Sequence, residues 1–276
     1  MARLIKDKYE AWKEECNTRF FQLKGNEEKL NKTFIDLYKL KDELSYGISN
    51  KDVTIHYIVD KKDDADLDLR YNKYLRTKKD EIKDLISYAV GCLFGRFSID
   101  YEGLAYAGGT WDESRYQTII PVSDNILTIS QDGAFDNDIV DKFINFIELV
   151  YGKETLEDNL QFIADAIEIN GSPRQAIREY FLTDFYKDHC KMYKKRPIYW
   201  LFDSGKKNGF KALIYLHRYN SNLLPTLISS YAQKDEGLAD YKNKLQKLAD
   251  KNINLDLDKG VIENYKILED VLAKIK

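Results

Sequence analysis

The sequence predicts a mostly helical fold with small β elements (α+β), arranged as a helical bundle with short hairpins. Only 4 of the 276 residues are Pro, so long helices are seldom interrupted. Hydrophobic residues make up 43% of the chain and charged residues 32%, which is typical of a globular protein with a substantial core. Apolar residues recur at helical spacing in long segments, whereas the runs typical of strands are short.

The N-terminal segment, residues 1–50, is expected to be helical. Leu30, Phe34, Leu37 and Tyr38 form one apolar stripe at helical spacing. The pair at 25–26, Gly followed by Asn, interrupts this pattern and predicts the start of a second helix there. The polar stretch 51–77 is expected to form an exposed loop.

A second domain is expected over residues 78–276. Its first helix, 78–97, carries a buried side, and its glycines 91 and 95 would permit close approach of another backbone. Residues 101–111 contain three glycines and predict a short hairpin, and two candidate edge strands follow at 119–122 and 126–129. The residues predicted to be buried on the first helix are Ile82, Leu85, Ile86, Ala89, Val90 and Leu93.

Three helices are predicted next, at 136–151, 155–169 and from Ser172 towards Lys194. Ser172 is a capping residue, and Pro173 follows at the first helical position. Two strands, 197–202 and 210–216, are joined by a turn rich in Gly and Lys. The C-terminal part is predicted to be helical over 222–250 and 261–276, with a coiled-coil seam at Leu238, Tyr241, Leu245 and Leu248.

Charge is concentrated in one segment. The net charge of −3 implies no global attraction to nucleic acid, so any affinity for DNA must come from a local patch. Residues 187–218 hold nine Lys or Arg against two Asp, with aromatic residues between them. This pattern predicts a surface that contacts phosphates, although the aromatics could equally be core residues of strands beside a solvated turn. The candidate DNA-binding residues are Lys194, Lys195, Arg196, Lys206, Lys207, Asn208, Lys211 and Arg218.

Several classes of site and location are not expected. The three cysteines are far apart and include no CxxC pair, which argues against a disulfide framework or a zinc site and favours the reducing cytoplasm. The three histidines have no spacing typical of metal ligands, so no metal site is predicted. No apolar run is long enough for a signal peptide or a membrane span, and no membrane partner is expected.

The run 195–219, KRPIYWLFDSGKKNGFKALIYLHRY, resembles a signature of the PglX family, the large adenine-specific DNA methyltransferases of BREX and phage-growth-limitation systems. Blocks at 26–38, 86–96, 103–109, 180–190 and 255–261 resemble the same family in the same order, over nearly the whole chain. Lys39 stands where the resemblance implies a glycine at a helix end, so that helix is expected to run further. The coiled coil after Tyr219 is shorter than the resemblance implies.

The resemblance implies the C-terminal, non-catalytic part of such an enzyme. Adenine methylation needs an Asn/Asp-Pro-Pro-Tyr/Phe loop, and no two of the four prolines are adjacent. The residues at 94–96 are only a fragment of a Phe-x-Gly-x-Gly cofactor loop. No catalytic or cofactor-binding residue is therefore expected here, and S-adenosylmethionine is expected in a catalytic domain that precedes Met1.

Two functions follow from the resemblance. The first is binding of double-stranded DNA and recognition of the target site in phage defence, in which Asn208 or Arg218 reaches a base edge. The second is a helical scaffold, in which helices 136–194 and 222–250 dock the methyltransferase domain or other defence-system subunits. Exposed apolar faces and self-association of the isolated chain would favour the scaffold.

Overall fold

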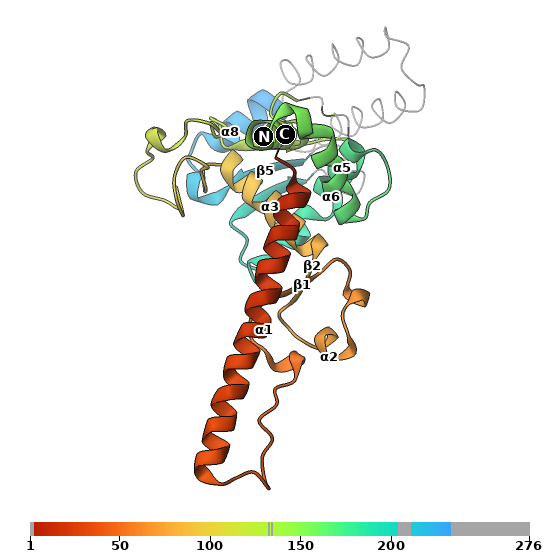
Figure 1. The fold of residues 1–276 in the computed structure, drawn as a ribbon. Helices are drawn as coiled ribbons and strands as arrows, with labels where there is room; N and C mark the ends of the chain where they lie inside the picture. Colours follow the sequence, from red (N-terminus) through yellow and green to blue (C-terminus); the bar gives the residue numbers. More distant parts are fainter. Residues whose placement is uncertain (1–2, 132, 134, 204–210, 233–276) are drawn as a thin grey trace.

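One long helix projects from the packed remainder of the fold (Figure 1). The computed structural model describes residues 3–131, 133, 135–203 and 211–232. The described part is mostly helical with two small sheets, so the predicted fold class is confirmed. The predicted coiled-coil seam and the predicted helix at 261–276 lie outside the described residues.

The projecting helix is α1, Ile5–Tyr38, and it is continuous. The predicted break at 25–26 is wrong, because α1 passes through Gly25, around which no atom lies within 4 Å of a Cβ position. A single glycine costs a helix only about 1 kcal/mol. The predicted extension beyond Lys39 is also wrong. Lys39 adopts the left-handed conformation (φ 56°) that glycine usually provides, and its N–H bonds back to Asp36 O.

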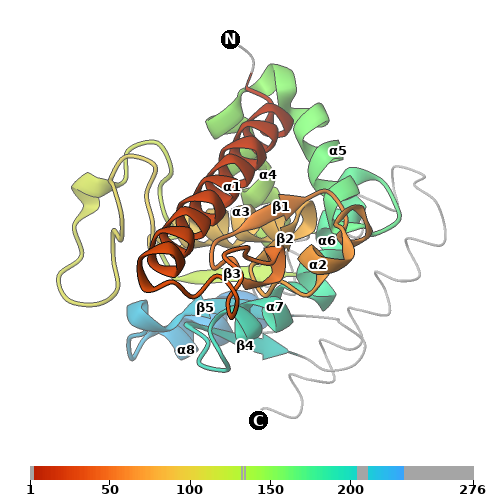
Figure 2. The same ribbon diagram turned by 60° about the horizontal axis from the view of Figure 1, so that its bottom comes forward.

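Residues 48–77 pack along α1 instead of forming the expected exposed loop (Figure 2). They contain two short parallel strands, β1 (Tyr57–Val59) and β2 (Leu75–Thr77), with the short helix α2 (Leu67–Arg70) between them. Val53 is completely buried against Phe20 of α1, in a cluster that also contains Leu69. The apolar residues among the many charges of this segment thus provide a small core of its own.

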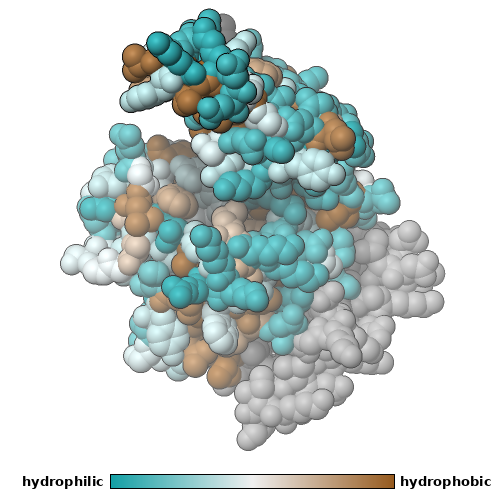
Figure 3. Space-filling model, turned by 90° about the horizontal axis from the view of Figure 1, so that it is seen from below, coloured by the Kyte–Doolittle hydropathy of each residue, from teal (hydrophilic) through white to brown (hydrophobic). Residues whose placement is uncertain are grey.

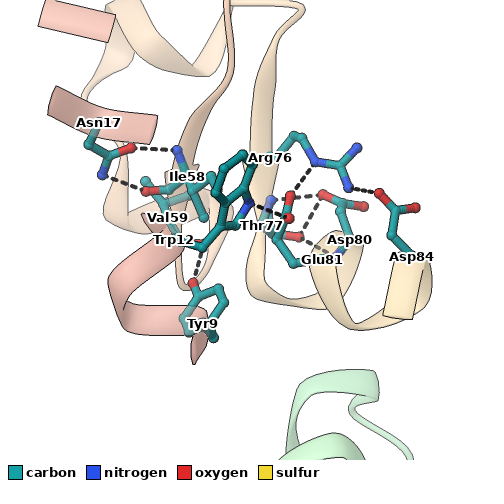
Figure 4. A network of polar contacts seen from close by, with 10 residues as sticks. All are labelled: Tyr9, Trp12, Asn17, Ile58, Val59, Arg76, Thr77, Asp80, Glu81 and Asp84. Carbon is teal, nitrogen blue, oxygen red and sulfur yellow. Dashed lines mark hydrogen bonds and ion pairs between the residues drawn. The ribbon is translucent and has the colours of Figure 1, made fainter. Parts of the chain in front are cut away.

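Polar contacts fasten this segment to α1 and to the start of the next helix (Figure 4). The Asn17 side chain makes two hydrogen bonds with the backbone of Ile58, at 2.8 and 3.0 Å. Trp12 Nε1 donates to Glu81 Oε2 at 2.9 Å, and Arg76 of β2 pairs with the same carboxylate. Three segments distant in sequence are therefore held in one arrangement.

The main core lies among five helices. The buried side predicted for the first of them is confirmed, with Leu85 only partly buried. Ser172 caps its helix together with Gln175, and Pro173 stands at the first position, as predicted. The helix predicted to run towards Lys194 is divided at Asp184. The five helices are α3 (Lys78–Leu93), α4 (Ile139–Tyr151), α5 (Leu156–Ile167), α6 (Pro173–Thr183) and α7 (Phe185–Met192).

A three-stranded antiparallel sheet closes the other side of this core. Its order is β3–β5–β4, with β3 at Ile126–Ile129, β4 at Tyr199–Asp203 and β5 at Lys211–Tyr215. All three strands were predicted. Alternate residues of the central strand β5 pack into two different hydrophobic cores. Leu213 and Tyr215 belong to the helical core, and Ala212 and Ile214 belong to a smaller core with α8, Leu223–Leu227.

The connection from α3 to β3 is irregular over residues 94–125, and it forms the long loops beside the body in Figures 1 and 2. The predicted hairpin at 101–111 and the strand at 119–122 are not formed; this part contains one isolated bridge and a 3-10 helix, Glu113–Arg115. Gly95 (φ 77°) and Gly91 make room for the rings of Trp111 and Phe97, and not for a second backbone. None of the described helices combines the length and the apolar character needed to cross a bilayer.

Candidate nucleic-acid interface

Within the basic segment, the turn that follows α7 is held by backbone hydrogen bonds. Lys194 and Lys195 both have left-handed φ values, 51° and 64°. The N–H of Lys195 donates to Cys190 O at 2.8 Å, and that of Arg196 donates to Tyr193 O at 2.9 Å. This double left-handed turn reverses the chain and leads it into β4.

A buried histidine attaches this turn to the strand. His189 Nε2 accepts hydrogen bonds from the backbone N–H groups of Ile198 at 3.1 Å and Tyr199 at 3.4 Å. The imidazole stacks on the Tyr199 ring at 4.5 Å between centroids. Burial, and to a smaller extent the charge of Arg96, lowers the pKa of His189 to about 4. His189 therefore serves as a neutral structural acceptor.

Three of the predicted DNA-binding residues lie together on the surface at this turn. The side chains of Lys194, Lys195 and Arg196 are exposed, and none forms an ion pair with a carboxylate of the described residues. The neighbouring lysines differ, because Lys187 pairs with Asp184 and Lys191 with Asp188, each at 3.3 Å. Three consecutive unpaired cations are thus presented to solvent on a defined backbone.

Two other predicted residues make internal contacts. Lys211 is only 7% exposed; its Nζ donates to Leu182 O at 2.7 Å and lies 3.2 Å from Asp203 Oδ2. The Arg218 guanidinium donates to backbone carbonyls, among them Val122 O at 2.9 Å, and lies 4.3 Å from the centre of the Trp111 ring. Lys211 links β5 to α6, and Arg218 holds the 94–125 connection. Lys206, Lys207 and Asn208 lie outside the described residues.

Sequence reasoning missed a further cation beside the turn, Arg96. Its Nη1 donates to the Tyr215 hydroxyl at 3.2 Å, and its guanidinium lies 5.8 Å from the centre of the Tyr193 ring. Arg96 follows α3, about a hundred residues before the basic segment, so no local charge pattern marked it. Contacts of Phe94 with Tyr199 and Tyr215 and of Arg96 with Tyr215 bring it there.

The 94–125 connection and Arg218 line an aromatic hollow of about 690 Å³. Trp111 stacks on Tyr116 at 4.8 Å and meets Tyr106 edge to face at 5.0 Å. Tyr116 donates a hydrogen bond to Gly95 O at 2.6 Å, and Asp100 accepts three hydrogen bonds from 117–118 at 2.6–2.8 Å. These contacts order a long connection that lacks regular secondary structure.

The part of the chain that the structure describes contains no group of three or more His, Cys, Asp or Glu side chains placed to hold a metal ion. His189 is occupied by backbone donors, and His217 Nδ1 lies 3.2 Å from Ala107 O. Cys16 and Cys92 are buried free thiols, and burial raises the pKa of Cys92 to about 12. A thiol held protonated in this way is a packing residue and not a nucleophile.

Two curated proteins are similar to the chain. It is 40% identical, over an alignment of 299 residues, to the adenine-specific methyltransferase PglX of Lacticaseibacillus casei (strain Zhang). It is 36% identical, over 252 residues, to the adenine-specific methyltransferase BrxX of Escherichia coli O9:H4 (strain HS). The matches cover 93% and 73% of this chain but only 23% and 21% of the relatives, so the chain spans less than a quarter of their length. No protein-family model matches.

Proposed function

We propose that this chain, which resembles the adenine-specific methyltransferases PglX and BrxX over most of its length, is a non-catalytic part of such an enzyme that binds double-stranded DNA and contributes to target recognition in phage defence. The resemblance inferred from the sequence is confirmed by the two relatives. The proposed enzyme transfers a methyl group to adenine, and its catalytic residues lie in the part of the relatives that this chain does not match.

The residues here that come nearest to a cofactor loop do not suit S-adenosylmethionine. In Phe94–Arg96 only Gly95 is a glycine, and a Cβ on it would lie 2.4 Å from the Trp111 ring. The space that a glycine loop leaves for a cofactor is therefore filled by an aromatic side chain. We place the cofactor outside this chain.

The observation that carries the proposal is the run of unpaired cations Lys194–Arg196. Six other described arginines pair with carboxylates, whereas Arg196 and the two lysines before it form no ion pair with a described carboxylate. Unpaired Lys and Arg side chains can instead neutralise phosphates and release the counterions of DNA. Trp200, 52% exposed on the edge strand β4, lies four residues beyond this run.

The test is fluorescence anisotropy of a labelled duplex with the isolated chain at several salt concentrations. The variant Lys194→Asn/Lys195→Asn/Arg196→Gln removes the charges, and Asn is compatible with the two left-handed positions. If all three side chains contact phosphates, the slope of log affinity against log salt falls by about 2.7, or about 0.9 per contact.

The matched control removes three exposed cations from α1, in Lys8→Gln/Lys29→Gln/Lys32→Gln. This variant has the same net charge as the test variant and should bind DNA with the wild-type salt slope. Equal losses in both variants would show that binding reflects net charge alone. Absence of binding by the wild type at low salt would remove the proposal for this chain.

A second function, a scaffold that docks the rest of the methyltransferase or other defence-system subunits, is favoured by an exposed apolar surface. Of the helices first expected to carry it, α4, α5 and α6 direct their apolar sides into the core, and most of 222–250 lies outside the described residues. It lies at the projecting end of α1, where large apolar side chains are more than half exposed, and is here named the α1 tip: Leu30, Phe34, Leu37, Tyr38, Leu44 and Tyr46.

A further inference from the structure

A half-buried arginine without a carboxylate partner stands behind the exposed cations. Arg96 Nε is buried and has no hydrogen-bond partner, and no ion pair joins Arg96 to the described residues. Its Nη2 forms no hydrogen bond with the described residues, and the side chain is only partly buried. An uncompensated charge in a partly desolvated position is unfavourable unless an anion or a hydrogen-bond network stabilises it.

The surroundings of Arg96 supply orientation but no negative charge. The guanidinium makes cation–π contacts with two rings, 5.3 Å from the centre of Phe97 and 5.8 Å from that of Tyr193. The Tyr215 hydroxyl accepts a hydrogen bond from Arg96 and donates its own hydrogen to Tyr106 O at 2.8 Å. The guanidinium is thus fixed, while Nη2 is left to bind an external acceptor.

The position is continuous with the proposed interface. Tyr193, whose ring covers Arg96, directly precedes Lys194, the first of the three exposed cations. The His217 ring stacks on Tyr215 at 5.2 Å, and burial and, to a smaller extent, the charge of Arg96 lower the pKa of His217. Residues from the 94–125 connection, the end of α7 and β5 therefore meet around one guanidinium.

We propose that Arg96 binds one phosphodiester of a nucleic-acid backbone, and that Lys194–Arg196 contact the phosphates beside it. The proposal rests on the proposed function for its ligand and deepens it, because it assigns one phosphate to a fixed, desolvated guanidinium and the others to flexible exposed side chains. A charge-assisted hydrogen bond from a preorganised arginine is stronger than one from an exposed lysine. Arg96 is accordingly the residue whose loss should weaken DNA binding most.

The first experiment compares wild type with Arg96→Met in the DNA-binding assay. One lost phosphate contact should lower the salt slope by about 0.9 and weaken affinity about tenfold at low salt. Arg96→Lys, which keeps the charge, should retain most of the slope. Arg174→Met, which removes an arginine paired with Glu157, is the control and should bind as wild type does. An unchanged slope in Arg96→Met, with DNA still bound, would overturn the assignment.

The second experiment separates this site from DNA binding in general. Inorganic phosphate should raise the midpoint of thermal unfolding of wild type, relative to chloride at equal ionic strength, and should raise it less in Arg96→Met. If phosphate stabilises wild type selectively but no duplex binds, the anion site stands and the proposed function fails. If Arg96→Met does not fold, the proposal is tested by the salt slope of Arg96→Lys and by the effect of phosphate on the unfolding midpoint of wild type. The proposal is overturned if phosphate raises the unfolding midpoint no more than chloride does in wild type, in Arg96→Lys and in the Arg174→Met control.

Discussion

At the scale of single residues, His189 shows how a polar side chain can organise a local fold. It is 2% exposed, and its Nε2 receives two backbone N–H groups at the start of β4. Because Nε2 accepts, the hydrogen of the neutral ring is on Nδ1, which is buried without a partner among the described residues. The protein thus tolerates one unsatisfied donor in order to satisfy two backbone donors beside the basic turn.

This arrangement predicts a loss of stability in mild acid. The pKa of His189 is about 4 in the folded protein, against about 6.5 in the unfolded chain, so the unfolded chain takes up a proton first as pH falls. The contribution of His189 is complete above pH 6.5 and is lost between pH 6.5 and 4. It amounts to about 3 kcal/mol at about 1.4 kcal/mol per pH unit. Urea unfolding at pH 7 and at pH 5 measures the effect.

The variant His189→Gln identifies the group responsible. Its amide oxygen can accept from the same backbone donors but does not titrate, so the variant should lose less stability between pH 7 and pH 5 than wild type. His56→Gln, at an exposed position, should retain the wild-type dependence. Identical dependence in wild type and His189→Gln would contradict the assignment.

At the scale of elements, α1 shows that one left-handed residue can end a 34-residue helix. Its C-terminal Lys39 has φ 56° and ψ 40°, a conformation that costs a residue with a Cβ roughly 1–2 kcal/mol. The helix still ends there, because Leu40 N bonds to Ile35 O at 2.9 Å and the chain then returns towards 48–77. The position at which α1 ends is therefore set by the course of the chain after Leu40 more than by the conformational preference of Lys39.

Lys39→Gly should therefore stabilise the end of α1. Relief of the left-handed strain, less the greater freedom of glycine in the unfolded chain, gives about 0.5–1 kcal/mol. Hydrogen exchange of the amides in the last turn of α1 should slow accordingly. Lys32→Gly, inside the same helix, should instead destabilise α1, by about 1 kcal/mol. Faster exchange in Lys39→Gly would show that Lys39 makes a compensating interaction.

At the scale of the whole molecule, α1 divides the protein into a packed body and a projecting arm. Near the body, Tyr9 is buried and Ile5 N donates to Asn159 of α5 at 2.8 Å. The α1 tip has no such cover from the described residues, and Leu37 there is 66% exposed. Figure 3 views the molecule from the end to which α1 points and shows hydrophobic side chains at the surface of the projecting arm. Large exposed apolar surfaces of this kind are typical of sites that contact other molecules.

The isolated chain should consequently self-associate through the α1 tip when no docking partner covers it. Leu30→Glu/Leu37→Glu places two charges on one face of the helix and should shift the chain towards monomer in analytical ultracentrifugation. Leu67→Glu/Ile120→Glu changes two equally exposed residues elsewhere and should leave association unchanged. A wild-type chain that stays monomeric at every concentration would count against the scaffold.

Much of the fold could be predicted because its signals are local. The buried side of α3, the Ser172–Pro173 start of α6 and the strands β4 and β5 follow from periodicity and capping chemistry within a few residues. The strands β1 and β2 were missed because each has three residues and gains its partner from across a polar stretch. The hairpin at 101–111 was wrong because its three glycines, all with positive φ, lie in an irregular loop in which no strand forms.

The candidate site was predictable only in part. The exposed turn at 194–196 lies within a segment whose charge stands out in the sequence. The same segment contains Lys211 and Arg218, and sequence could not distinguish them from surface cations. Their contacts, with Leu182 and with Val122, come from other elements of the fold.

The sequence by itself determined the helical class, the strands around the basic segment and the relationship to adenine-specific methyltransferases. Each of these depends on residue order over short distances or on similarity along the chain. Tertiary structure alone decided which cations reach solvent, which apolar stripe stays uncovered and where Arg96 lies. Burial and polar contacts arise between residues as distant in sequence as Arg96 and Tyr215, which the packing of Phe94 on Tyr215 brings close in space.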